Sequence, residues 1–216
     1  MNRAGSKAVK LMRDQYLLFR NNDFIALNKP AGIETVAGKE PGGALRLIIE
    51  SMALQSECPI PVNSLKADVS GVQLMSLNAP AGKLARSTIK NGKFWRCSYW
   101  GIVTGRIPGR VSSSIINIPL RYGVPATDGE PCITHWKVLK FTEGECGLSL
   151  VEFEPRTNVE NQINIHCNVS LKTPLAIGHS LHLQSVSACL PGGDDVRIVA
   201  PPIGDFKNQL ESLGWL

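Results

Sequence analysis

The sequence predicts an α+β domain with a mixed, mostly antiparallel sheet and flanking helices. Segments rich in β-branched and aromatic residues outnumber helical segments, and most are separated by short turns rather than by helices. The chain has 216 residues, 43% of them hydrophobic, which is enough to bury the core of one large domain. Charged residues make up 19%, which is typical of a folded chain and excludes an intrinsically disordered one.

Three elements are expected before residue 78. The alternating segment at 23–28 predicts a strand, which ends at the Pro/Gly stop of residues 29–32. Apolar residues recur close to helical spacing at 44–55, where we expect a helix. A second strand is expected at 72–77, directly after Ser70-Gly71.

Residues 79–90 predict a helix with one apolar face. Leu84 and Ile89 are expected to point inward, and the basic residues of the segment are expected to point outward. The turn Asn91-Gly92 follows, and then an aromatic- and valine-rich strand at 94–104. The remaining segments predict several short strands and a terminal amphipathic helix; the strands are around 114–120, 132–141 and 147–153, within 160–171 and at 196–199, and the helix is at 206–215.

The chain is expected to consist of an N-terminal basic segment, residues 1–19, and one domain, residues 20–216. The first thirteen residues carry four basic side chains and no acid. This composition fits a short mitochondrial presequence and fits an ordinary basic helix equally well. No apolar stretch is long enough to span a bilayer, so no membrane association is expected.

Cysteines and histidines do not predict a metal or redox site. No two of the six cysteines have C-x-x-C spacing, which favours reduced, mostly buried thiols. His179 and His182 are three residues apart, but no acid or cysteine lies at a supporting spacing. We therefore expect no metal and no cofactor.

The charge is distributed unevenly along the chain. From residue 69 to residue 127 there is no Asp or Glu, although the net charge of the whole chain is only +5. Basic side chains attract phosphates, and interleaved aromatic side chains offer faces for unstacked bases. On charge alone the partner is a polyanion, which leaves DNA, RNA and anionic lipid open. The candidate phosphate-binding residues are Lys83, Arg86, Lys90, Lys93 and Arg96.

Five segments follow one another along the chain: Asp23–Gly32 with its Asn-Lys-Pro-x-Gly signature, Ser64–Gly71, Tyr99–Gly105, Cys132–Leu139 and the strand and turn at Leu150–His166. In this order they resemble the RluA/RsuA family of pseudouridine synthases. The resemblance covers roughly residues 20 to 200, and it is greatest to divergent mitochondrial members with a similarly altered loop at 64–71. It implies a bent sheet and binding of structured RNA, above all ribosomal RNA or a ribosome assembly particle, and it adds a mitochondrial location as an expectation. The segment that the family has near Gly178 is shorter here.

The resemblance also implies a change in the catalytic loop. The family isomerises uridine in RNA with an aspartate in Arg-Leu-Asp-x-x-Thr-Ser-Gly, and an ionised carboxylate is needed for that step. Anchored on Ser70-Gly71, the aspartate position holds Lys66, whose charge is inverted. Asp68 is the alternative acid, and it reaches the site only if the loop shifts by two residues. The family's basic residues are also replaced, by Ser64, Val159 and Asn164.

Three further residues keep the family's pattern. Tyr99 is expected either to stack on a base or to lie in the core, and Gln162 and His166 are expected to contact RNA. Two functions follow from different classes: an RNA-binding protein with impaired catalysis, and an active uridine-to-pseudouridine isomerase that uses Asp68 or a group of a partner. A third, a module that binds protein instead of RNA, is disfavoured by the acid-free basic segment.

Overall fold

The computed structural model describes residues 15–37, 40–41, 45, 48–49, 59–90, 95–107, 112–121, 123–143, 147–190 and 195–216. Residues 36, 37, 40, 41 and 90 are described by their backbone alone. The predicted basic segment lies almost wholly outside these ranges, as does most of the helix expected at 44–55, whose described residues Leu45, Ile48 and Ile49 are helical.

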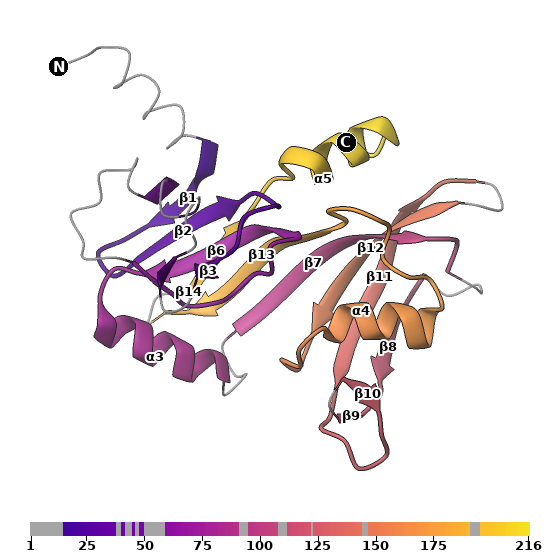
Figure 1. The fold of residues 1–216 in the computed structure, drawn as a ribbon, viewed down its shortest axis with the longest axis horizontal. Coiled ribbons are helices and arrows are strands. Elements are labelled where there is room, and N and C mark those ends of the chain that lie inside the picture. Colours follow the sequence, from indigo (N-terminus) through magenta and orange to yellow (C-terminus); the bar gives the residue numbers. More distant parts are fainter. Residues whose placement is uncertain are drawn as a thin grey trace.

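A ten-stranded sheet forms the centre of the molecule (Figure 1). Its main path runs β1-β2-β6-β13-β7-β12-β11-β8, while β14 pairs with β13 and β5 with β6. Only β6 and β13 run parallel; the other pairs of this sheet are antiparallel, which confirms the predicted mixed sheet. The strands are β1 (Leu17–Arg20), β2 (Phe24–Lys29), β5 (Ile60–Pro61), β6 (Val69–Ser76), β7 (Trp95–Thr104), β8 (Ser113–Asn117), β11 (Ile133–Phe141), β12 (Leu148–Pro155), β13 (Leu181–Cys189) and β14 (Asp195–Val199).

Two short hairpins lie outside this sheet. One pairs β3 (Val36–Ala37) with β4 (Glu40–Pro41), and the other pairs β9 (Leu120–Arg121) with β10 (Val124–Pro125). The sheet itself begins at Leu17, three residues before the domain boundary placed at residue 20, because β1 pairs with β2. No helix within the described ranges is long and apolar enough to cross a membrane.

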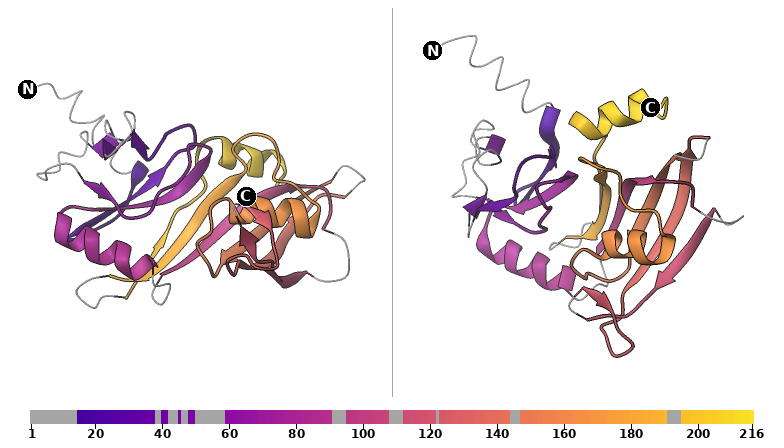
Figure 2. Two further views of the ribbon diagram at one scale, coloured as in Figure 1. Left: turned by 60° about the horizontal axis from the view of Figure 1, so that its bottom comes forward. Right: turned by 45° about the vertical axis from the view of Figure 1, so that its right-hand side comes forward.

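The sheet buries apolar side chains on both of its faces, because successive residues of a strand point to opposite sides. On β2, Phe24 and Ala26 enter one core cluster, while Ile25 and Leu27 enter another. The half with β1, β2 and β6 and the half with β12, β11 and β8 are turned relative to each other and meet along β13 and β7 (Figure 2). Tyr99 and Leu181 pack against the clusters of both halves on one face.

Helix α3 (Ala79–Lys90) has the bounds predicted from the sequence. Asn78 caps it, because its Oδ1 accepts a hydrogen bond of 2.9 Å from the backbone N–H of Ala81. The expected inward face is wrong in part: Ala81 and Ala85 are buried and Ile89 is packed on the core, whereas Leu84 is 55% exposed. The buried stripe of Ala81, Ala85 and Ile89 therefore faces the sheet, and its two alanines let that part of the helix lie close to the strands.

Residues 162–171 are helical, so the strand expected within 160–171 is wrong. They form α4 (Gln162–His166) and the π-helix η1 (Cys167–Leu171). The buried side chains Ile163, Cys167 and Leu171 recur every four residues and fill the core beside β7 and β12. Helix α5 (Gly204–Ser212) confirms the expected terminal helix and covers the opposite face through Phe206 and Leu210.

Candidate functional site

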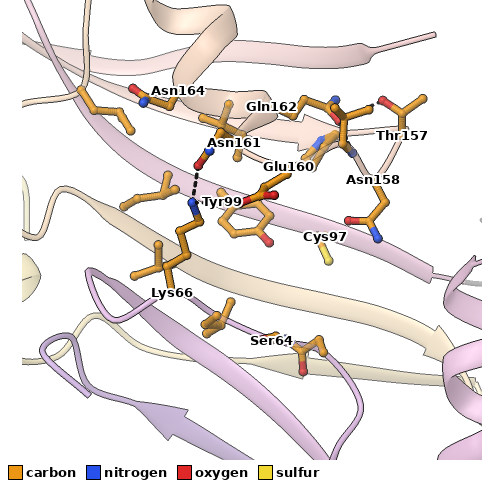
Figure 3. Close-up of a pocket in the computed structure, with 18 of the residues that line it drawn as sticks. Ser64, Lys66, Cys97, Tyr99, Thr157, Asn158, Glu160, Asn161, Gln162 and Asn164 are labelled. Carbon is orange, nitrogen blue, oxygen red and sulfur yellow. Dashed lines mark hydrogen bonds and ion pairs between the residues drawn. The ribbon is translucent and has the colours of Figure 1, made fainter. Parts of the chain in front are cut away.

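A cleft of about 1060 Å³ opens between the two halves of the sheet. The loop at 62–69 forms one wall and residues 155–164 form the facing wall, with Tyr99 of β7 between them (Figure 3). Residues within 175–181 also line the cleft. This volume is at the upper end of the range for sites that bind small molecules, and it is large enough for a nucleotide turned out of a helix.

Tyr99 lies on β7 where the two halves meet, and it lines the cleft between its walls (Figure 3). The residue is half-buried. Burial raises the pKa of the Tyr99 phenol above its usual value, so the hydroxyl stays protonated. Tyr99 packs on the core and also lines the cleft, so the expected core packing is confirmed and stacking on a base stays a prediction. Beside it, burial raises the pKa of the Cys97 thiol to about 12, which keeps it unreactive at neutral pH.

Lys66 reaches across the cleft from the 62–69 loop to the facing wall (Figure 3). Its Nζ donates a hydrogen bond of 2.5 Å to Oδ1 of Asn161 and lies 3.5 Å from Oε1 of Glu160. The side chain of Lys66 is 53% exposed and that of Glu160 is 84% exposed, so water screens this ion pair. The cleft thus contains an ammonium with an acid and an amide as its partners.

The buried Lys29 holds the loop that carries Lys66. Its Nζ donates to three backbone carbonyls, those of Pro30 at 3.1 Å, Ile33 at 2.7 Å and Lys66 at 3.1 Å. Burial lowers the pKa of Lys29 to about 8, and the nearby charge of Asp68 acts in the opposite direction. The Asn-Lys-Pro-x-Gly segment therefore has a structural role, which is to fix the position of the loop.

Gln162 and His166 hold the facing wall from inside. The Nε2 of Gln162 donates to the carbonyl of Ile133 at 2.7 Å and to Oγ1 of Thr134 at 2.8 Å, and Thr134 lies 2.9 Å from Nδ1 of His166. His166 is fully buried and Gln162 is 4% exposed. The predicted contact of His166 with RNA is contradicted, because its side chain reaches no surface. Gln162 lines the cleft, but its amide is bonded within the fold, and its contact with RNA stays a prediction.

Asn161 stands at the start of α4 in a left-handed conformation, with φ 58°. Asparagine adopts this region more readily than other residues with a side chain, and the Oδ1 of Asn161 accepts a hydrogen bond from Lys66. No local pattern in the sequence pointed to Asn161 or Glu160 as residues of the site.

Residues 23–169 match the family model of RNA pseudouridylate synthase. The chain belongs to this family. Among curated relatives, it is 27% identical over 169 residues to an uncharacterized RNA pseudouridine synthase of Zymomonas mobilis, which covers 74% of each chain. It is 29% identical over 218 residues to the uncharacterized RNA pseudouridine synthase YhcT of Bacillus subtilis, covering 89% of this chain and 70% of the relative. Ribosomal large subunit pseudouridine synthase C of Rickettsia conorii is 24% identical over 170 residues, covering 76% and 55%.

Two solved human structures share the fold of this synthase-family chain. RNA Pseudouridylate Synthase Domain Containing 4 superposes with a TM-score of 0.74 at 16% identity and covers 98% of this chain and 97% of its own. RNA Pseudouridylate Synthase Domain Containing 1 has a TM-score of 0.69 at 15% identity, with 95% and 96% covered. The predicted α+β pseudouridine synthase fold is therefore confirmed.

The predicted phosphate-binding residues of this synthase-family chain do not share one surface. Lys83 and Arg86 are exposed on α3. Arg96 is exposed on β7, but the neighbouring side chains of Trp95 and Cys97 point into the cleft, so Arg96 points to the opposite face of the sheet. The side chain of Lys90, and Lys93 as a whole, lie outside the described residues.

Asp68 lines the same cleft as Tyr99 and is exposed. Its charge acts on the buried Lys29 beneath the loop. In the described part of the chain no group of three His, Cys, Asp or Glu side chains is placed to hold a metal ion. The charged side chains that line the described part of the cleft are the bases Lys66 and Arg156 and the acids Asp68, Glu130 and Glu160, and the phenol of Tyr99 also lines it.

Proposed function

We propose that this synthase-family protein binds structured RNA in the cleft and does not isomerise uridine. The observation that carries the proposal is that the ammonium of Lys66 projects into the cleft toward Asn161 and Glu160. The resemblance of residues 64–71 to the family's catalytic loop aligns Lys66 with the aspartate of that motif. An ammonium cannot act as the carboxylate nucleophile or base, whereas it can bind a phosphate.

The RNA in this proposal is ribosomal. Several relatives are named ribosomal large subunit pseudouridine synthase C, and their names give the class of RNA that we transfer to this chain. We further propose that the protein acts in mitochondria on ribosomal RNA or on its assembly, because the first thirteen residues have the composition of a presequence.

An active isomerase is the second candidate, and one observation favours it. Asp68 is a carboxylate that lines the same cleft as Tyr99, so an acid and an aromatic side chain are both present there. In this alternative, Asp68 replaces the missing aspartate. Both candidate functions involve binding the same RNA, but only the active isomerase converts its uridine. One set of protein and RNA samples therefore distinguishes the two functions.

We expect the purified protein to bind ribosomal transcripts with an affinity that falls steeply with salt, and to release no tritium from transcripts labelled at C5 of uridine. Replacing both Lys83 and Arg86 with glutamine is expected to flatten the plot of log affinity against log salt by about 0.9 per lost phosphate contact. The matched control is Lys207→Gln on α5, at the opposite face, which is expected to leave the slope unchanged.

Two outcomes would contradict this account in different ways. Stoichiometric release of tritium that disappears in Asp68→Ala would establish the active isomerase. An affinity independent of salt would mean that few phosphates are contacted, and would favour a protein-binding module instead.

A further inference from the structure

We propose that Lys66 is a phosphate-binding residue of the cleft and that Glu160 occupies it until a phosphodiester of RNA takes its place. This inference rests on the proposed binding of RNA. It adds a specific subsite and a specific competitor, a carboxylate of the protein itself.

The charges that line the cleft select Lys66 for this role. Lys66 and Arg156 are the only basic side chains among the described residues that line it. Arg156 already contacts Oε2 of Glu154 at 2.7 Å and is mostly buried, with 27% of its side chain exposed. The side chain of Lys66 is 53% exposed, so a phosphate that enters the described part of the cleft meets Lys66 first.

Glu160 is the weaker of the two partners that Lys66 contacts. The distance from Nζ to Glu160 Oε1 is 3.5 Å, compared with 2.5 Å to Asn161 Oδ1. Exposed ion pairs with this geometry contribute little. A phosphodiester carries the same single negative charge as a carboxylate, so an RNA that is also held by its other contacts can take the place of Glu160 at little cost. Asn161 is neutral, so it can continue to orient the ammonium, which has three protons to donate, after Glu160 has left.

Removing the competing carboxylate is expected to strengthen binding. With a labelled RNA stem-loop that has a uridine-rich loop as the probe, Glu160→Gln is expected to bind about two- to fivefold more tightly than the unchanged protein, because the exposed pair no longer has to be broken. Lys66→Gln is expected to bind more weakly and to lose about 0.9 from the salt slope.

The control for net charge is Glu130→Gln. Glu130 is exposed and lines the same cleft, and no ion pair joins it to a described residue, so the substitution removes the same charge from the same region. Long-range attraction of RNA changes in both variants, whereas release of Lys66 occurs only in Glu160→Gln. The expected gain of Glu160→Gln is therefore larger than that of Glu130→Gln.

The double variant Lys66→Gln/Glu160→Gln completes a double-mutant cycle. With no ammonium to release, its gain over Lys66→Gln is expected to fall to that of Glu130→Gln. If the excess gain of Glu160→Gln persists without Lys66, or equals that of Glu130→Gln from the start, the subsite is wrong while RNA binding stands. If the unchanged protein does not bind the stem-loop or ribosomal transcripts, the proposed function itself is wrong. All three substituted side chains are exposed, so each of the four variants is expected to fold.

Discussion

Replacing Gly71 with alanine is expected to destabilise the protein by more than about 3 kcal/mol, the range reached by severe core defects. Gly71 lies where β6 runs parallel to β13, directly opposite Leu183. Its φ is +115°, and an added Cβ would lie 2.2 Å from the carbonyl oxygen of Leu183. That oxygen belongs to the backbone of a central strand, so relief requires the two strands to separate.

Gly178→Ala is the matched control for this prediction. Gly178 also has a positive φ, +95°, but an added Cβ would meet nothing within 4 Å. It is expected to cost only backbone strain, on the order of 1–2 kcal/mol. Urea unfolding of both variants measures the two free energies. A loss in Gly71→Ala no larger than that in Gly178→Ala would contradict the close approach of β6 and β13.

Acidification from pH 7 to pH 4 is expected to remove about 3 kcal/mol of stability through His182 alone. His182 is fully buried; its Nε2 lies 2.9 Å from the carbonyl oxygen of Ala200 and its Nδ1 2.8 Å from Oγ of Ser70. Nε2 must donate to the carbonyl, so the neutral ring accepts the hydroxyl proton at Nδ1. Phe206 stacks on the ring at 5.3 Å. Burial lowers the pKa of His182 from 6.5 to about 4.

The sign of this effect follows from proton uptake. Between pH 6.5 and about 4 the unfolded chain has bound a proton at His182 and the folded protein has not. Stability is therefore complete above pH 6.5 and is lost as the pH falls toward 4. His182→Gln is expected to be less stable at pH 7, and its stability is expected to change less between pH 7 and pH 4. Equal pH slopes for His182→Gln and the unchanged protein, measured by urea unfolding, would show that His182 is not the group responsible.

Local patterns in the sequence predicted the bounds of helix α3 correctly. The bounds of α3 follow from Asn78 as a cap and from the run of helix-compatible residues after it. Ile89 packs on the core as predicted, but Leu84 was wrongly expected to point inward because it is more hydrophobic than the alanines Ala81 and Ala85 that are buried instead. Tertiary packing determines which face of α3 is buried, and no local sequence signal indicates that face.

The segment at 160–171 shows a second limit. Ile163, Ile165 and Val169 are β-branched and favour a strand on propensity. The bond from Gln162 to Ile133 and the contact between His166 and Thr134 instead stabilise a helix against β11. The same bonds explain why two residues expected to contact RNA are buried.

The sequence predicted several of the residues that line the cleft, but not how those residues contact one another. Lys66, Asp68 and Tyr99 do line one cleft. The contact between Lys66 and Asn161 joins residues 95 positions apart, and such pairs have no local signature. The face to which Arg96 points follows from the alternation of side chains along a strand, because its neighbours Trp95 and Cys97 point to the other face.

The central claim is that RNA occupies the cleft and its uridine stays unchanged. The most direct test is to cross-link the protein to RNA in cells, map the bound nucleotides, and examine the same nucleotides for pseudouridine. The account predicts contacts clustered on ribosomal RNA with unmodified uridine at the bound positions. Pseudouridine at a bound position that disappears when the protein carries Asp68→Ala would contradict it.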